Sequence, residues 1–259
     1  MNADIIGGLL SSAVRNAVSG KDTAVSFSGG IDSGLIAAMA TEYTENVRLY
    51  TVGTEGAHDV LKAEEAAKLL DLEQEHILLT EDNIEGLLKE MIHISGTEDP
   101  LTLSFEIPTF CVTKFCSEHS IIGGIGADEL FGGYHRYIGM PPSEFKDARN
   151  EDLKKLMSYV IPHEDKVADY FGKTIHRPFV DRDLVDAVLS LPCEEILPSD
   201  KRPRKAILKE IAESMNLNLL AETEKKAAQY GSGAMGLIRK SARKEKLTVG
   251  EYVKSFSDR

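Results

Sequence analysis

The chain has 259 residues, a net charge of −12 and an apolar content of 42%, which support one large α/β domain or two small ones around a sizeable core. No apolar run is long enough to cross a bilayer, and the first twenty residues lack a secretory signal pattern, so we expect a cytoplasmic protein. The negative charge argues against general affinity for nucleic acid.

In chain order, residues 1–20 predict an amphipathic helix that ends near Gly20, because its apolar side chains lie on or near one face. These apolar residues are Ile5, Ile6, Leu9, Leu10 and Val14. Residues 23–27 then predict a strand, and the helical spacing of Leu35, Ile36 and Met39 predicts a helix soon after it.

Strand and helix candidates alternate beyond this point. Expected strands cover residues 47–52, 75–79 and 120–122; expected helices cover residues 60–70, 84–94 and 108–116, with a loop at 97–103. This alternation predicts an α/β fold, a Rossmann-like parallel sheet with helices on both faces, in which ligands bind at the carboxyl ends of strands. From about Pro141 onward helical segments dominate, so we expect a helical C-terminal half that packs against the sheet.

The segment between the first strand and its helix reads SGGIDS, from Ser28 to Ser33. Gly29 and Gly30 let the backbone approach an anion closely, while the serine hydroxyls and the helix start add hydrogen-bond donors. Asp32 would repel a bare phosphate but suits an anion that arrives with Mg2+. The alternative interpretation is a strand-to-helix turn in which Asp32 or Ser33 caps the helix. The segment lacks the lysine of a Walker A loop.

These six residues after a strand resemble the pyrophosphate loop of the N-type ATP pyrophosphatases. That group includes asparagine synthetases, NAD synthetases, GMP synthetases and tRNA-modifying enzymes. The resemblance implies that ATP is cleaved between its α and β phosphates, that an acceptor is adenylated and that pyrophosphate is released into the loop. It implies nucleotide binding at Phe27, Ser28, Gly29, Gly30, Asp32 and Ser33.

A second glycine-rich stretch narrows the family. Residues 123–134, GGIGADELFGGY, resemble the asparagine synthetase signature, in which a glycine-rich turn after a strand precedes Asp-Glu and Phe-Gly-Gly-Tyr. Gly123 and Gly124 allow close backbone approach to a nucleotide. Asp128 adds a second carboxylate for the Mg2+–pyrophosphate beside Asp32.

Other segments match the same family in order, over roughly residues 5–240. The end of the second strand resembles the place where Val52 offers backbone groups to adenine. Lys205, in the run KRPRKAIL, resembles a lysine that neutralises phosphate charge during adenylation. Lys225 and Lys226, with the glycines of residues 231–233, resemble a mobile tail that closes over the nucleotide.

The resemblance implies a stand-alone synthetase domain at residues 21–259 behind an N-terminal helix at residues 1–20. Its implied catalytic residues are Asp32, Asp128, Lys205 and Glu129, with Asp32 and Asp128 as metal ligands. The run RPFVD resembles a family motif with one residue fewer between arginine and proline, so Arg177 is displaced from the motif position.

Two departures from the family concern nitrogen. Glutamine-dependent members expose a cysteine after removal of Met1, and Asn2 stands there instead. Nitrogen must then come from free ammonia, a separate glutaminase subunit or another amine. Many members also carry an acidic residue at the position of Ile125, and isoleucine cannot take a proton. Another carboxylate such as Glu129 or Glu106 is a substitute, although Glu129 has an alternative structural role at a helix start.

Charge and cysteines leave further alternatives open. Residues 201–259 hold 14 basic and 7 acidic side chains, whereas the rest of the chain is acidic. The basic tail fits closure over a polyphosphate, contact with RNA or a plain solvated surface. The cysteines show no metal-ligand spacing, and we expect buried structural thiols at Cys111, Cys116 and Cys193.

The sequence as a whole predicts an ATP-dependent ligase that adenylates a small carboxylate, aspartate by resemblance, and converts it to an amide. The alternatives are an adenylating enzyme for another acid or a tRNA base, and a nucleotide-binding subunit without turnover. We expect no membrane partner and disfavour nucleic acid. A homodimer remains open.

Overall fold

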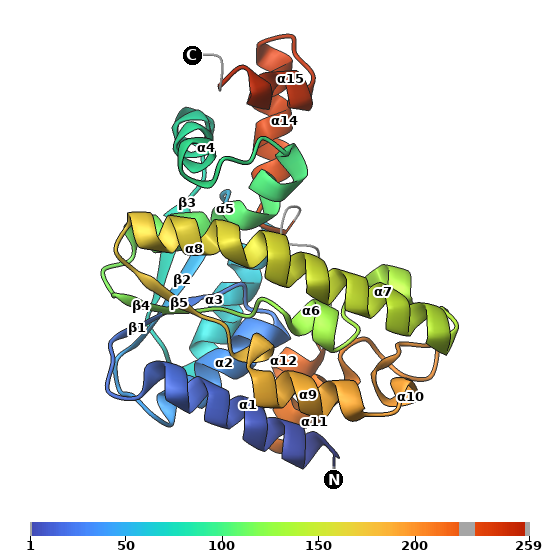
Figure 1. The fold of residues 1–259 in the computed structure, drawn as a ribbon. Coiled ribbons are helices and arrows are strands. Elements are labelled where there is room, and N and C mark those ends of the chain that lie inside the picture. Colours follow the sequence, from blue (N-terminus) through green and yellow to red (C-terminus); the bar gives the residue numbers. More distant parts are fainter. Residues whose placement is uncertain (1, 223–230, 257–259) are drawn as a thin grey trace.

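The computed structural model describes residues 2–222 and 231–256, and its centre is a parallel sheet of five strands in the order β3-β2-β1-β4-β5 (Figure 1). The strands are β1 (Thr23–Ser26), β2 (Val47–Gly53), β3 (Gln74–Leu78), β4 (Ser120–Ile122) and β5 (Thr174–His176). The order reverses between β1 and β4, because β2 and β3 lie on one side of this pair and β5 on the other. The loops that follow β1 and β4 therefore border the crevice where ligands bind in such sheets.

Both faces of the central strands β1 and β4 carry buried apolar residues. Val25 and Ile122 belong to one hydrophobic cluster, whereas their neighbours Ala24 and Ile121 belong to the other. Successive strand residues point to opposite faces, so strands with buried apolar residues on both faces need a helical layer on each side.

Helices supply these two layers (Figure 1). The layer on one face contains α1 (Asn2–Val18), α2 (Ile31–Thr41), α3 (His58–Leu70), α9 (Arg182–Ser190), α11 (Ala206–Ser214) and α12 (Asn218–Glu222). The layer on the other contains α4 (Glu81–Ser95), α5 (Pro100–Phe115), α8 (Ile161–Tyr170), α14 (Ala234–Lys244) and α15 (Val249–Lys254). Two short helices, α6 (Ala127–Leu130) and α10 (Cys193–Ile196), lie in connecting segments.

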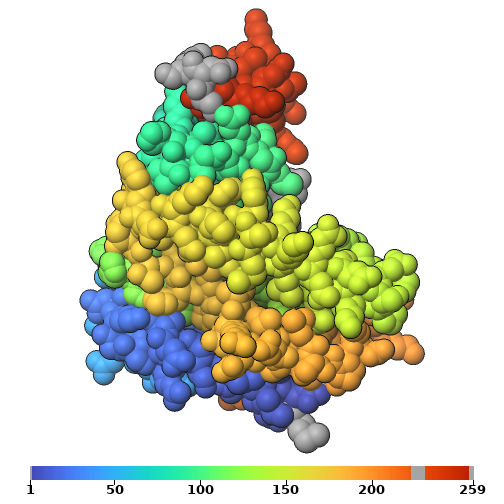
Figure 2. All heavy atoms as spheres, in the orientation of Figure 1, coloured from blue at the N-terminus to red at the C-terminus, as the bar shows by residue number. Residues whose placement is uncertain are grey.

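A long helical run leads into the second layer. Helix α7 (Pro142–Lys155) continues through a π-helical turn at Leu156–Val160 into α8, and this run forms a continuous band, yellow-green to yellow, across the face in Figure 2. Pro162 explains the wide turn, because it lacks an N–H group and its ring crowds the carbonyl of Ser158 within the turn. Such turns are frequent at functional sites.

The parallel sheet with helices on both faces confirms the fold class expected from the sequence. Helix α1 and strands β1 to β4 also lie where the sequence pattern placed them. Among the described residues, no helix is both long and apolar enough to span a membrane.

Two expectations about individual elements are wrong. The predicted loop at 97–103 is largely helical, because α5 begins at Pro100 and contains Pro108 in its interior. Asp99 caps this helix by accepting a hydrogen bond from the Thr102 N–H at 2.8 Å, and a proline suits the first helical position. The strand β5 was missed, because three residues within a helical half give too short an alternation.

The Asp99 cap can be tested through stability. We expect Asp99→Ala to lower the free energy of unfolding by about 1 kcal/mol, because the Thr102 N–H loses its acceptor. Asp99→Asn keeps an acceptor oxygen and should lose much less. Urea unfolding of both variants measures the difference, and equal losses would contradict the capping role.

Candidate active site

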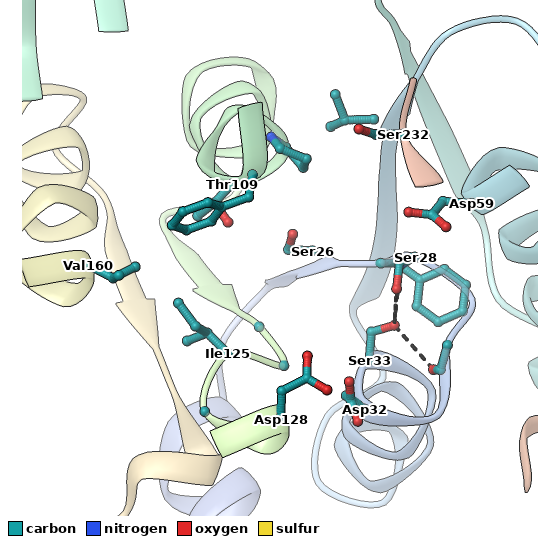
Figure 3. Close-up of a pocket in the computed structure, with 18 of the residues that line it drawn as sticks. Ser26, Ser28, Asp32, Ser33, Asp59, Thr109, Ile125, Asp128, Val160 and Ser232 are labelled. Atoms are coloured by element: carbon teal, nitrogen blue, oxygen red, sulfur yellow. Dashed lines mark hydrogen bonds between the residues drawn. The ribbon is translucent and has the colours of Figure 1, made fainter. Parts of the chain in front are cut away.

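A cavity of about 550 Å³ opens at the carboxyl ends of β1, β2 and β4. Figure 3 shows Ser28, Asp32 and Ser33 on one side of it and Ile125 and Asp128 on the other. The cavity therefore lies where the strand order reverses, between the two loops that the sequence singled out.

Ser28 and Ser33, at the two ends of the SGGIDS loop, contact each other. The Ser28 N–H donates to Ser33 Oγ at 3.2 Å, and the two serine hydroxyls lie 3.4 Å apart (Figure 3). Gly30 is the N-cap residue of α2 and provides no side-chain cap. The first N–H groups of α2 therefore have no capping side chain, as in anion-binding loops at helix starts.

Gly29 is required by space and by backbone conformation. Its φ is +68°, and a Cβ there would lie 2.5 Å from backbone atoms of Lys62 and Ala63 in α3. Backbone atoms cannot move aside as a flexible side chain can. The loop can approach α3 this closely only with glycine at this position.

One buried lysine joins the two loops. Lys205 Nζ lies 2.6 Å and 2.5 Å from the two carboxylate oxygens of Asp32, and 2.7 Å from Asp128 Oδ1. The side chains of Asp32 and Asp128 come from α2 and α6, and that of Lys205 from the residue before α11. The structure thus brings together three of the four catalytic residues implied by the resemblance.

Lys205 is held in an unusual conformation. It is 4% exposed, and its φ of +57° places a non-glycine residue in the left-handed region. Such strain is characteristic of functional positions. Gly133 packs against the ion pair of Lys205 and Asp128. A Cβ at position 133 would lie 2.0 Å from Asp128 Oδ1 and 2.4 Å from Lys205 Cε.

The second glycine-rich turn packs directly against the first loop. A Cβ on Gly124 would lie 3.0 Å from Asp32 Cβ, and Gly126 has a φ of +95°. Ile125, between these glycines, lines the cavity together with Gly123 (Figure 3). An apolar side chain therefore stands in the cavity at the position where the sequence resemblance led us to expect an acid.

Val52 of β2 lies beyond the last residue pair of the ladder between β1 and β2. The last register pair of β1 with β2 is Ser26 with Tyr50, whose carbonyl accepts from the Phe27 N–H at 2.9 Å. Backbone groups of alternate residues face the same neighbour, so those of Val52 face the side where β1 has ended. Val52 and Phe27 both line the cavity.

Glu129 has a partner within the second motif. Its Oε1 accepts a hydrogen bond from the Tyr134 hydroxyl at 2.6 Å, and Glu129 is 8% exposed. Burial and the nearby Glu129 carboxylate raise the pKa of Tyr134, which keeps this phenol protonated. The contact places a tyrosine hydroxyl on this carboxylate.

Glu106 lies behind the cavity wall. It is 4% exposed, does not line the cavity, and has His163 Nδ1 at 3.6 Å from its Oε1. Burial, with the neighbouring Glu164 and Asp99 carboxylates, raises the pKa of Glu106 to about 8. Glu106 is therefore mostly protonated at neutral pH.

Glu164 is a cavity residue that the sequence analysis missed. It is 5% exposed, lines the cavity from α8 and accepts a hydrogen bond from Arg177 Nε at 2.9 Å. Arg177 Nη2 also lies 2.9 Å from Oδ1 of the exposed Asp165. Burial raises the pKa of Glu164, and the Arg177 charge and Thr109 oppose this shift. Only the packing of α8 against β5 reveals Glu164, since no motif surrounds it.

The donor set at the loops suits a magnesium ion bound with phosphate. Asp32 and Asp128 present carboxylate oxygens to one cation, the Lys205 ammonium. The described residues contain no cluster of three or more histidine, cysteine or acidic ligands that could hold a metal alone. Mg2+ commonly uses one or two carboxylates and completes its ligands with phosphate oxygens and water.

The C-terminal segment contributes in part to the cavity. Ser232 lines it (Figure 3), and the Ser232 carbonyl accepts a hydrogen bond from the Thr54 N–H at 2.9 Å. Lys225 and Lys226 lie outside the described residues. Lys240 and Lys244 of α14 instead form ion pairs with Glu81 of α4.

The expectation of buried thiols holds for two of the three cysteines. Cys111 and Cys116 are buried, and burial raises the pKa of the Cys116 thiol to about 11. Cys193 is partly exposed, contrary to the expectation. It begins α10, a short helix at the surface.

The buried acid at Glu106 predicts a pH-dependent stability. Between its ordinary pKa of 4.5 and its folded pKa of about 8, the folded protein retains a proton that the unfolded chain releases. Each pH unit in this window therefore lowers stability by up to about 1.4 kcal/mol. We expect Glu106→Gln to gain stability relative to wild type as pH rises from 5 to 8.

Urea unfolding across this pH range checks the expectation, with Glu98→Gln as a control for removing one exposed carboxyl. A Glu106→Gln advantage that stays constant or shrinks as pH rises would contradict the inferred protonation state.

Sequence comparison relates the chain to proteins of known name. The chain is 30% identical over 285 residues to a Methanocaldococcus jannaschii protein that carries the name asparagine synthetase (glutamine-hydrolyzing) 1, covering 94% of this chain and 52% of that protein. It is 28% identical over 202 residues to asparagine synthetase (glutamine-hydrolyzing) 1 of Arabidopsis thaliana, covering 71% of this chain and 34% of the relative. The chain thus spans about half or less of these relatives' length.

Among solved structures, the NH3-dependent NAD synthetase from Campylobacter jejuni superposes with a TM-score of 0.48 at 16% identity, covering 100% of this chain and 93% of that one. The family model described as Asparagine synthase matches residues 6–149 and 141–246. These matched segments cover nearly the whole chain and include both glycine-rich loops and Lys205, so the chain belongs to the asparagine synthase family.

Proposed function

We propose that the chain is an ATP-dependent ligase that adenylates a small carboxylate with release of pyrophosphate and then forms an amide. The observation that carries this proposal is the Lys205 bridge between Asp32 and Asp128, at the meeting of the two loops. It places one ammonium and two carboxylates beside the N-terminus of α2, which suits a polyphosphate bound with a cation.

In the first step, a carboxylate oxygen of the acid attacks the α-phosphorus of ATP. The bond between the α-phosphorus and the oxygen that bridges to the β-phosphorus breaks, and its electron pair leaves on pyrophosphate. Ser28, Ser33 and the start of α2 donate hydrogen bonds to the leaving pyrophosphate, and Lys205 balances its charge. Mg2+, held by Asp32 and Asp128, would supply additional charge neutralisation.

In the second step, the nitrogen of an amine attacks the acyl carbon, and the carbon–oxygen bond to AMP breaks. AMP leaves with the electron pair, and the attacking nitrogen gives up a proton. A base near the acyl group therefore favours this step. Ile125 cannot act as that base, Glu129 holds Tyr134, and Glu106 lies behind the wall.

We propose that Glu164 accepts the proton that the attacking nitrogen gives up. Its carboxylate lines the same cavity, and the contacts from Arg177 and Thr109 leave acceptor capacity, because a carboxylate offers about four lone-pair sites. Arg177 also fixes the orientation of the carboxylate. A charged amine approaching Glu164 would therefore meet a positioned hydrogen-bond acceptor within a largely apolar wall.

The acceptor half of the cavity is lined mainly by apolar side chains from three elements and the second loop. These residues are Leu101, Phe105, Ile125, Leu156, Val160 and Ile175. Aspartate is the acid suggested by the family, and this lining also accommodates acids with an apolar body. The nitrogen comes from ammonia, which a separate glutaminase subunit could supply, or from a primary amine.

The central test measures pyrophosphate release from ATP and Mg2+ with aspartate and a series of other small acids. We expect release that depends on one acid and falls about a hundredfold in Asp32→Ala, because the cation at the phosphates loses a ligand. Asp22→Ala is the matched control, since Asp22 is an exposed acid just before β1.

Undiminished release in Asp32→Ala would contradict the assigned role of the loop. ATP binding with no pyrophosphate from any acid would instead indicate a nucleotide-binding subunit without turnover.

A second test separates the two steps. Glu164→Gln should lower amide formation by about a hundredfold and leave acid-dependent exchange of pyrophosphate into ATP within about twofold of wild type, because glutamine cannot accept a proton. Asp165→Asn is the matched control, since it also removes a carboxylate from Arg177 but lies outside the cavity.

Ammonium and a set of primary amines serve as nucleophiles in separate assays. Equal losses of exchange and amide formation in Glu164→Gln would show that Glu164 only maintains the fold.

A further inference from the structure

A second cavity of about 480 Å³ lies behind the SGGIDS loop. Its basic lining comes from the run KRPRK, from α11 and from the segment after the Phe-Gly-Gly-Tyr motif. The basic residues among its described lining are His135, Arg202, Arg204, Lys205 and Lys209, and that lining includes no acidic residue. The function proposed above uses only Lys205 from this set.

The second cavity adjoins the proposed phosphate site. Ile31, the first residue of α2, lines both cavities. Lys205 lines the second cavity and binds the Asp32 and Asp128 carboxylates of the first. An anion released at the SGGIDS loop therefore has the basic cavity directly beside it.

The two arginines are anchored through part of their guanidinium groups. Arg202 Nε donates to the Glu195 carbonyl at 2.8 Å, and its Nη2 lies 3.5 Å from Glu210. Arg204 Nη1 donates to the Gly133 carbonyl at 3.0 Å. Each guanidinium has five N–H donors, so both retain donors for a ligand after these contacts.

Among the described contacts of these cations, Lys209 has the fewest. It lies on α11, four residues after Lys205, which is the N-cap residue of that helix, and both residues line the cavity. Within residues 2–222 and 231–256, Lys209 Nζ forms no hydrogen bond or ion pair, and the side chain is only partly exposed. Its charge is available to a ligand in the cavity.

Several cations line this one cavity. The chain as a whole carries a net charge of −12, yet three cations besides Lys205 and His135 surround one cavity. Like charges at short range destabilise one another, and a bound polyanion reverses this effect. Guanidinium groups suit phosphate oxygens because their N–H donors are arranged in a fork.

We propose that this cavity binds inorganic pyrophosphate and receives it from the SGGIDS loop after ATP cleavage. The source of the ligand rests on the proposed function, whereas the binding site rests on the basic cavity alone. Pyrophosphate binds here while a nucleotide still occupies the first cavity. Its release then does not require the nucleotide site to empty.

The test uses the α,β-methylene analogue of ATP, which cannot be cleaved between the α and β phosphates. Protein saturated with this analogue and Mg2+ is titrated with pyrophosphate by calorimetry. We expect wild type to bind pyrophosphate under these conditions and Lys209→Glu to bind it about tenfold more weakly.

Lys201→Glu is the matched control, because it makes the same charge change at an exposed residue that does not line the cavity. We expect it to stay within about twofold of wild type. Lys209→Gln should weaken binding less than Lys209→Glu. Thermal unfolding of each variant confirms that the fold is kept, and Lys209→Gln decides the matter if Lys209→Glu does not fold.

Absence of pyrophosphate binding to the analogue-saturated protein would overturn the proposal. Equal weakening by Lys209→Glu and Lys201→Glu would also overturn it, because binding would then follow net charge. If the analogue itself fails to bind, the proposed function fails. Pyrophosphate titrated alone then still tests the basic cavity through the contrast between the two charge reversals.

Discussion

The ion-pair arrangement around Lys205 is the constraint on which the rest of the site depends. A buried ammonium and two carboxylates are costly to desolvate, and they are retained only where their geometry is well satisfied. Lys205 meets Asp32 and Asp128 at 2.5–2.7 Å and adopts a left-handed backbone to do so. Three helix starts, those of α2, α6 and α11, must therefore meet at one point.

The glycines around this point follow from the same constraint. Gly29, Gly124 and Gly133 each approach a neighbouring segment so closely that a Cβ would lie 3.0 Å or less from it. The sheet supplies the remaining geometry, since the reversal of strand order between β1 and β4 sends their loops to opposite sides of one crevice. The phosphate side of the cavity is consequently closely packed and polar.

The acceptor side is built differently. Its apolar lining comes from α5, the π-helical turn, β5 and Ile125, and its buried carboxylate comes from α8. In the proposed function, the two sides of the cavity serve different steps. Adenylation relies on the two glycine-rich loops, and attack by the amine relies on Glu164. The basic cavity behind Lys205 would add a path for pyrophosphate that leaves the acceptor side undisturbed.

The sequence by itself determined the parallel α/β fold, the two glycine-rich loops and the family, because these depend on local periodicity and on residues close together in the chain. It could not determine β5 or the true start of α5, where tertiary pairing and a cap outweigh weak local signals. Nor could it reveal Glu164 or the basic cavity. Their residues carry no motif, and only the packing of distant helices brings them to the site.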